Sequence, residues 1–368
     1  MLPMKIGIFS ECYHPIANGV VASIDALCDG LRAAGHDAFV VAPSGSSAVC
    51  IPSLPLPTRT AYRLVLPVLD RRARAHVRSF DVIHTHSPFV TGWMGVRFAR
   101  RHGIPLVFTY HTQLEEYAHY VPFERSATRR AATTLTRTYA NLADTVIVPT
   151  SAMEPRLRGL GVTSSIAVVP TGIDVERFAA GRRSDGLRKR LGATKLILLV
   201  SRLAREKNID LAIAALGGLE DPGVHLALAG DGPERAGLAE TARAAGLEGR
   251  VHFLGHVARQ ELPDLYASSD AFVFPSFTET QGLVLAEALV AGLPIVAVDT
   301  PQSRDVLEGH GLLVSPRSDA MAWGLREALA MRRDQSAAHL ALNRFSLRLQ
   351  ADRTIEIYRG LLAERRTA

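Results

Sequence analysis

The chain has 368 residues, 47% of them hydrophobic and 21% charged, which is ordinary for a globular protein of two domains. It contains no run of about 18 uninterrupted apolar residues, so a membrane-spanning helix is not expected. The N-terminus lacks the apolar segment of a secretory signal, and the three cysteines have no metal or redox spacing. We therefore expect a cytoplasmic protein.

The net charge of +6 lies entirely in the first part of the chain. Residues 1–170 hold 17 Lys and Arg against 11 Asp and Glu, and the remainder is balanced. The arginines bunch in three places: Arg71, Arg72 and Arg74; Arg97, Arg100 and Arg101; Arg125, Arg129 and Arg130. Such clusters either face an anionic membrane surface or form solvated helix faces. No nucleic-acid motif accompanies them, so we expect no nucleic-acid partner.

Short apolar runs predict two sets of buried strands. The first set covers Lys5–Ser10, Asp37–Ala42, Asp81–His84, Pro105–Tyr110, Thr145–Pro149 and Ile166–Pro170. The second set covers Lys195–Ser201, Val224–Gly230, Arg250–Gly255, Ala271–Phe274, Pro294–Asp299 and Gly311–Val314. Helical patterns alternate with these strands, which is typical of parallel sheets covered on both faces. The Ser- and Pro-rich segment 44–60 is expected to be a loop.

The pattern predicts an α/β protein with two doubly wound, Rossmann-like domains. Pro170 and Gly172 punctuate the change between them. We expect an N-terminal domain over residues 1–172, a C-terminal domain over 173–345, and a closing helix over 346–368 that packs back on the first domain. Ligands of such sheets bind beyond the carboxyl ends of the strands, so a cleft between the domains is the expected site.

Two loops of the first domain carry candidate binding residues. The loop after the first strand ends at Gly19 and lacks the GxGxxG spacing of a dinucleotide site, but its backbone can approach a phosphate. His111 follows another strand and begins a polar stretch with donors and acceptors for sugar hydroxyls. Candidate acceptor-binding residues nearby are Glu115, Glu116, Tyr117 and, at the end of a further strand, His86. HExxH is absent, so no metal is assigned to this histidine–acid cluster.

In the second domain, Arg202 stands just past a strand end and Lys207 sits at the start of the next helix. Two cations at the mouth of a sheet can neutralise a diphosphate and stabilise it as a leaving group. The alternative is a surface basic loop whose charge is balanced by Glu206.

Two acids eight positions apart, Glu279 and Glu287, flank the start of an apolar helix. Eight helical residues rise about 12 Å, whereas glycosidase carboxylates sit roughly 5 to 9.5 Å apart. The wider gap suits a nucleotide diphosphate sugar, with hydroxyls at both ends and negative charge between them. The N–H groups of Gln281, Gly282 and Leu283 would face that middle. In the alternative reading, both acids are solvated surface groups.

The chain resembles retaining glycosyltransferases of family 4, which have the GT-B architecture. The matching motifs are GIFSECYHPIANGVVASI, VVPTGID, SRLAREKNID, AGDGPER, VHFLGHV and the family's Glu, seven residues, Glu pattern at Glu279 and Glu287. Thr171 stands where many relatives carry Asn. The resemblance implies a retaining hexosyl transfer without a protein nucleophile, with no cofactor and no obligatory metal.

The resemblance also implies roles for the site residues. Arg202 and Lys207 would bind the donor diphosphate, and Glu287 would bind the ribose. Glu279, with the amides from Gln281 to Leu283, would hold the transferred sugar, which His111 would contact from the first domain. We therefore expect His111, Glu279, Arg202 and Lys207 to be the catalytic residues.

A narrower resemblance rests on HSPFVTG, TYHTQLEEYAHY and TETQGL, which are similar to bacterial 1,2-diacylglycerol 3-glucosyltransferases. It implies UDP-glucose as the donor, a lipid acceptor, and a peripheral position at the inner face of the cell membrane. The alternative within the family is a mannosyl- or galactosyltransferase acting on another glycolipid or a soluble polysaccharide precursor. The alternative outside it is a binding module for nucleotide sugars or nucleic acid that has no catalytic activity.

Overall fold

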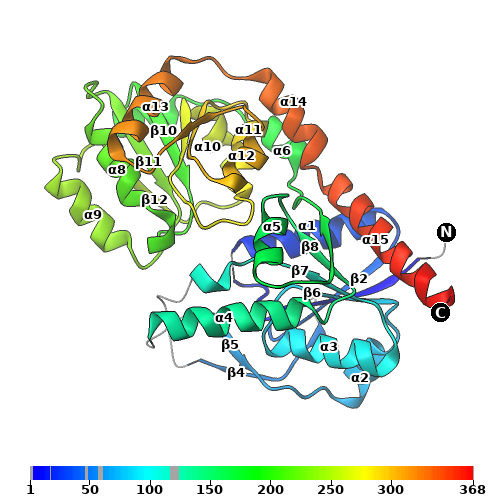
Figure 1. The fold of residues 1–368 in the computed structure, drawn as a ribbon. Coiled ribbons are helices and arrows are strands. Elements are labelled where there is room, and N and C mark those ends of the chain that lie inside the picture. Colours follow the sequence, from blue (N-terminus) through cyan, green and yellow to red (C-terminus); the bar gives the residue numbers. More distant parts are fainter. Residues whose placement is uncertain (1–2, 17, 46–48, 57–60, 117–123, 368) are drawn as a thin grey trace. The chain divides into compact units, whose positions relative to one another are not determined.

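The computed structural model describes residues 3–16, 18–45, 49–56, 61–116 and 124–367 (Figure 1). The chain divides into two compact units. The first unit consists of Met1–Gly172 together with Leu347–Ala368, and the second consists of Ile173–Ser346. The chain therefore leaves the first unit after Gly172 and returns to it at Leu347. In the described part of the chain, no helix is both long and apolar enough to cross a membrane.

The first unit is built on a seven-stranded parallel sheet with the order β3-β2-β1-β6-β7-β8-β9. Its strands are β1 (Lys5–Phe9), β2 (Asp37–Ala42), β3 (Val49–Cys50), β6 (Val82–Thr85), β7 (Leu106–Thr109), β8 (Thr145–Val148) and β9 (Ser165–Val168). A separate antiparallel pair is formed by β4 (Ser53–Pro55) and β5 (Arg63–Val65). The prediction of a plain loop over 44–60 was wrong, because β3 and β4 lie within it.

The helices of the first unit are α1 (Gly19–Ala33), α2 (Arg71–Val77), α3 (Val90–His102), α4 (Arg125–Ala140), α5 (Met153–Gly159) and α15 (Leu347–Thr367). The last of these, α15, packs against α1. The two helices approach so closely that a Cβ on Gly30 of α1 would lie 2.7 Å from the Cβ of Ala351. On the same helix, Tyr358 is fully buried and joins the core beneath β1 and β6.

The second unit has a six-stranded parallel sheet with the order β12-β11-β10-β13-β14-β15. Its strands are β10 (Lys195–Val200), β11 (Val224–Ala229), β12 (Val251–Gly255), β13 (Ala271–Phe274), β14 (Ile295–Val298) and β15 (Leu312–Val314). Most of the central strands are buried along their whole length, because helices cover both faces of the sheet. The predicted fold class, two doubly wound parallel sheets, is confirmed.

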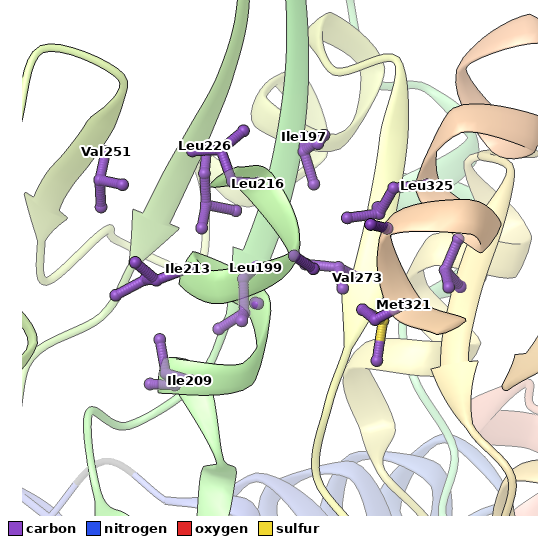
Figure 2. Packing of buried hydrophobic residues seen from close by; sticks show 14 of the residues in the cluster. Ile197, Leu199, Ile209, Ile213, Leu216, Leu226, Val251, Val273, Met321 and Leu325 are labelled. Atoms are coloured by element: carbon purple, nitrogen blue, oxygen red, sulfur yellow. The ribbon is translucent and has the colours of Figure 1, made fainter. Parts of the chain in front are cut away.

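The helices of the second unit are α6 (Val175–Ala179), α7 (Gly186–Leu191), α8 (Ile209–Gly217), α9 (Arg235–Ala244), α10 (Leu262–Ser268), α11 (Leu283–Val290), α12 (Pro301–Leu307), α13 (Ser318–Ala330) and α14 (Gln335–Arg344), with a short 3₁₀ helix, η2 (Arg205–Lys207). Figure 2 shows one face of the sheet, where Ile213 of α8 and Met321 of α13 pack over Leu199 and Val273. The opposite face is covered by α6, α10, α11 and α14.

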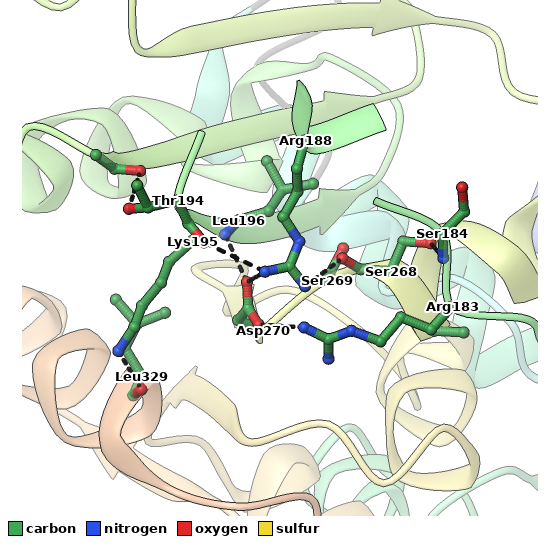
Figure 3. Close-up of polar contacts among 12 residues, drawn as sticks. Arg183, Ser184, Arg188, Thr194, Lys195, Leu196, Ser268, Ser269, Asp270 and Leu329 are labelled. Atoms are coloured by element: carbon green, nitrogen blue, oxygen red, sulfur yellow. Dashed lines mark hydrogen bonds and ion pairs between the residues drawn. The ribbon is translucent and has the colours of Figure 1, made fainter. Parts of the chain in front are cut away.

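Polar contacts fasten the amino ends of β10 and β13 (Figure 3). Asp270, just before β13, accepts a hydrogen bond of 2.9 Å from the backbone N–H of Leu196. The same carboxylate pairs with Arg188 at 3.1 Å and with Arg183 at 3.3 Å. These groups hold the two strands in register at one edge of the sheet. The opposite edge, where the strands end, carries the candidate site.

Candidate active site

The strand order of the second unit reverses between β10 and β13. The chain runs outward from β10 through β11 to β12, and then resumes at β13 on the other side of β10. In open parallel sheets, ligands bind beyond the carboxyl ends of the strands at such a point. Arg202 and Lys207 follow the end of β10, and Glu279 follows the end of β13. The topology therefore brings the predicted cations and the predicted acid to the same edge.

Lys207 and Glu279 form an ion pair, although 72 positions separate them in the sequence. The two side chains are 18% and 21% exposed, so ligand can reach both. Ser276 donates a hydrogen bond of 3.2 Å to the same carboxylate oxygen of Glu279. Asn208, in the left-handed region with φ of 53°, donates its side-chain amide to the carbonyl of Pro275 at 3.3 Å. These contacts join the loop after β10 to the loop after β13.

Arg202 pairs with Glu206 at 2.5 Å. The guanidinium side chain is 52% exposed, whereas that of Glu206 is only 3% exposed. A surface pair between Arg202 and Glu206 was the alternative to diphosphate binding, and this pair is present in the structure. Because the acid is buried beneath the exposed arginine, the pair fixes the guanidinium at the edge of the site, where its positive charge can attract an anion.

Helix α11 begins beside this pair. Gly282 precedes it with φ of 78°, and a Cβ at that position would lie 2.9 Å from the ring of Phe274. Both facts require glycine there. The N-cap residue is glycine, so no N-cap side chain accepts from the first-turn N–H groups. Gln281 is buried, and Leu283 is the first helical residue.

Glu287 lies inside α11 and is buried, with 4% exposure. The phenol of Tyr266, from α10, donates a hydrogen bond of 2.8 Å to its carboxylate. Burial raises the pKa of Glu287 to about 7, against the lowering effects of Arg259 and of the Tyr266 hydrogen bond. The reading of Glu287 as an exposed helix-surface acid was wrong. A carboxyl with this pKa is available as a strong hydrogen-bond acceptor when ionised, which suits vicinal hydroxyls.

In the first unit the strand order reverses between β1 and β6, and histidines follow the ends of β6 and β7. His86 Nδ1 and His111 Nε2 are 2.7 Å apart, and the two rings stack. His84, within β6, lies between the hydroxyls of Tyr358 and Thr109, each at 2.6 Å. Tyr358 thereby connects α15 to the residues behind His86.

The three imidazoles are neutral at physiological pH. Burial lowers the pKa of His84 to about 3 and that of His111 to about 4. Burial also holds the pKa of His86 well below its usual range, and the neighbouring histidines add to this effect. His111 can therefore exchange hydrogen bonds with a sugar hydroxyl, but it does not carry a proton as an imidazolium.

The other first-unit candidates differ in their surroundings. Glu115 is buried and accepts two hydrogen bonds from Arg156, at 2.7 and 3.0 Å. Glu116 accepts one from Arg156 at 2.8 Å and pairs with Arg129 at 3.0 Å. Both acids thus hold α5 and α4 to the loop after β7. Tyr117 lies outside the described residues.

Gly19 is the first residue of α1. It is exposed, and a Cβ there would meet nothing within 4 Å. The side chain of Asn18 caps the helix by accepting from the N–H of Val21. The open space above Gly19 leaves its backbone accessible to an anionic ligand.

Three contacts of the site were not predicted from the sequence. Ser276 comes three residues before Glu279, which is a local signal that serine in the loop could orient the acid. Asn208 adopts a conformation that asparagine favours among non-glycine residues, which is a second local signal. Tyr266 gives no such signal, because its partner Glu287 is 21 positions away. Among the residues that the structure describes, no His, Cys, Asp and Glu side chains form a group suited to a metal ion.

Comparison with known proteins places the chain in a family. Residues 17–177 match Glycosyltransferase Family 4, and residues 187–343 match Glycosyl transferases group 1. The chain is 32% identical to an alpha-monoglucosyldiacylglycerol synthase of Acholeplasma laidlawii over 80% of each chain. It is 34% identical to a GDP-mannose-dependent alpha-mannosyltransferase of Mycobacterium tuberculosis, over 85% of this chain and 84% of the relative.

Among solved structures, the Anabaena protein HepE in complex with UDP-glucose shares the fold. The TM-score is 0.77 at 21% identity, over 97% of this chain and all of the other. This likeness concerns the fold, whereas the two sequence relatives extend over most of both domains. The chain belongs to glycosyltransferase family 4 and is a glycosyltransferase of the GT-B fold.

Proposed function

We propose that this enzyme transfers a hexose, with retention of anomeric configuration, from a nucleotide diphosphate sugar to a lipid acceptor at a membrane surface. The preferred pair is UDP-glucose and 1,2-diacylglycerol. The observation that carries the donor half is the ion pair between Lys207 and Glu279 at the point where the second sheet reverses its strand order. The acceptor half is supported by the similarity to the alpha-monoglucosyldiacylglycerol synthase of Acholeplasma laidlawii.

The donor roles follow from the charges at that edge. Arg202 and Lys207 supply the positive charge that a diphosphate needs, both as a bound group and as a leaving group. Glu279 compensates Lys207 in the absence of ligand and is positioned by Ser276. When phosphate engages the ammonium, the carboxylate becomes available to sugar hydroxyls. The uncapped N–H groups after Gly282 add a partial positive charge to the same region.

The remaining roles concern the two ends of the donor. Glu287, with Tyr266 behind it, offers an acceptor to the ribose hydroxyls. His111, kept neutral by burial, offers a hydrogen bond to the transferred sugar. In the transfer itself, the acceptor hydroxyl oxygen bonds to the anomeric carbon while the bond from that carbon to the β-phosphate oxygen breaks. The hydroxyl proton passes to the departing phosphate, so no protein group is consumed.

A second candidate donor is GDP-mannose. It is favoured by the 34% identity to the mannosyltransferase of Mycobacterium tuberculosis, which is as high as the identity to the glucosyltransferase. The proposed donor-binding residues contact the diphosphate and the sugar hydroxyls. Both UDP-glucose and GDP-mannose carry these groups. The donors therefore have to be compared directly.

The test combines donors with acceptors. UDP-glucose, UDP-galactose and GDP-mannose are each supplied with diacylglycerol in mixed micelles, with phosphatidylinositol, or with a soluble polyol. Products are identified by mass spectrometry, and the anomeric configuration by proton NMR. We expect an α-linked glycosyldiacylglycerol from one donor. Turnover with soluble acceptors and none with any lipid would contradict the acceptor, and an inverted product would contradict the mechanism.

A further inference from the structure

Large apolar side chains are exposed mainly on one region of the first unit. Of the eleven that are exposed among the described residues, eight lie there: Leu54, Leu56, Tyr62, Leu64, Leu66, Val68, Phe89 and Trp93. Six of these come from the segment that carries β4, β5 and the strand-to-α2 connection, and two from the start of α3. Three of them, Val68, Phe89 and Trp93, line one groove, and exposed apolar surface around a groove often marks a binding face.

An apolar groove adjoins this region, with a volume of about 1120 Å³. It runs along α3 from Phe89 to His102, and Leu69, α2 and Leu135 of α4 form its other sides. Helix α3, which lines it, has 13 residues and is roughly 20 Å long. Trp93 and Phe98 line it from α3. Figure 1 shows α2, α3 and the β4–β5 pair together in the lower part of the view.

The rim of the groove is strongly basic. Arg74, Arg78, Arg97, Arg100 and Arg101 line it, and no carboxylate does. All five are exposed. No ion pair with any of them is found in the described part of the chain, and among their side chains only that of Arg74 makes a hydrogen bond there, to the backbone carbonyl of Leu69. Five guanidinium groups without an ion-pair partner among the described residues thus surround an apolar groove. An occupant that is both apolar and anionic fits these properties best.

Two other occupants fit these properties less well. A second copy of the chain docked face to face would bring the two sets of arginines together, which costs free energy by repulsion. Single-stranded nucleic acid would neutralise the arginines and could stack on Trp93. However, Leu69, Met94 and Val96 also line the groove, and these apolar side chains offer contact to hydrocarbon rather than to stacked bases.

We propose that this face docks on an anionic phospholipid bilayer, with one acyl chain in the groove along α3 and the lipid phosphates at its arginines. Trp93 and Phe89 then sit at the level of the headgroups, where aromatic side chains are favoured. The arginine stems cover hydrocarbon while their charges reach phosphate. This inference rests on the proposed function, because an enzyme that glycosylates a lipid has to reach that lipid in a membrane.

The groove also leads toward the candidate site of the same unit. Pro88 and Phe89, at its opening, follow His86 by two and three residues, and His86 contacts His111. An acceptor lipid whose chain lies along α3 can have its polar end at the carboxyl edge of the first sheet, where these histidines lie, while the phosphates of neighbouring lipids meet the arginines farther along the helix. The docking face and the histidine pair are thus successive parts of one path along the unit.

The test uses tryptophan fluorescence. The chain has two tryptophans, so Trp323→Phe leaves Trp93 as the sole reporter. The full-length variant is titrated with vesicles of phosphatidylcholine alone or mixed with phosphatidylglycerol. We expect a blue shift of Trp93 emission, and quenching by lipids brominated on the acyl chain, with the mixed vesicles. Replacing both Arg97 and Arg101 by glutamine should weaken this binding about 30-fold.

A matched control removes two charges elsewhere. Arg182→Gln with Arg190→Gln changes exposed arginines of the second unit by the same charge, and vesicle binding should stay as in the parent. Unchanged Trp93 emission with anionic vesicles would overturn the proposal, as would equal binding of the two double variants. So would a blue shift that depends on protein concentration alone, which marks self-association, or tighter binding to single-stranded RNA than to vesicles.

The outcome can be separated from that of the proposed function. Vesicle binding is measured without a sugar donor, and glycolipid synthesis is measured in detergent micelles without a bilayer. Trp93 insertion with no glycolipid product would leave the docking face standing and refute the acceptor. Product in micelles with no Trp93 insertion would refute the docking face alone.

Discussion

Replacing Glu287 by glutamine tests whether ionisation of this buried carboxyl destabilises the folded protein. The side chain lies within α11, is 4% exposed, and accepts a hydrogen bond from Tyr266. Its pKa is raised from 4.5 to about 7, with burial as the largest cause. Glutamine keeps the shape and an oxygen that can accept from Tyr266, and it removes the ionisable group.

The sign and size of the effect follow from the two pKa values. The unfolded chain releases this proton near 4.5, whereas the folded chain holds it up to about 7. Because the folded state binds more protons in that interval, ionisation of Glu287 lowers stability progressively as pH rises from 4.5 to about 7. A shift of this size corresponds to about 3 kcal/mol. That is a substantial part of the stability of a typical domain.

Guanidinium unfolding at about pH 5 and about pH 8 measures this difference. We expect Glu287→Gln to be more stable than the parent by less than about 1 kcal/mol at the lower pH and by about 3 kcal/mol at the higher pH. Glu220→Gln, an exposed acid of the same unit, is the control and should change little. Equal stability of variant and parent at both pH values would refute the reasoning.

The same variant separates stability from function. If Glu287 holds the ribose, Glu287→Gln loses affinity for the nucleotide sugar while it gains stability. A functional residue that is costly to the fold is a common compromise in enzymes. Isothermal titration with the nucleotide diphosphate checks the affinity, and an unchanged dissociation constant would assign Glu287 to the fold rather than to the donor.

Three further predictions follow from the described contacts. Glu279→Ala and Arg202→Ala should each abolish sugar transfer with an unchanged circular dichroism spectrum, and wild-type rates in either would contradict the site. Tyr358→Phe removes a hydrogen bond to the buried histidine of β6 and should cost about 1–3 kcal/mol in denaturant unfolding, where an unaltered midpoint would contradict it. Gly30→Ala should cost about 1–3 kcal/mol because its Cβ would meet α15, whereas Gly360→Ala, which has open space, should stabilise by roughly 0.5–1 kcal/mol.

Much of the fold could be predicted because its central strands are buried on both faces. Such strands appear as short apolar runs, and β11 and β13 are examples in which every residue is buried. The short strands β3 and β4 escaped prediction because their segment is rich in Ser and Pro, and few of their side chains enter a core. Local composition carries no signal for such edge elements.

The site was predictable as residue types but not as contacts. Lys207 and Glu279 were both identified, yet their pairing depends on β13 lying beside β10, which is a property of the sheet order. The bond between Tyr266 and Glu287 depends likewise on how α10 and α11 pack against the same sheet face. Likewise, Glu115 was taken as a ligand group from its neighbours in sequence, whereas its arginine partner comes from α5.

The return of the chain to its first unit affects the order in which the protein can fold during synthesis. The second unit is complete once Ser346 has been made, but the first unit still lacks α15 at that point. Until α15 emerges, the face of α1 around Gly30 lacks its cover, and His84 lacks one of its two hydroxyl partners, that of Tyr358. The domain that is translated first is therefore completed last, because α15 has to leave the ribosome before the residues behind the histidine pair are fully supported.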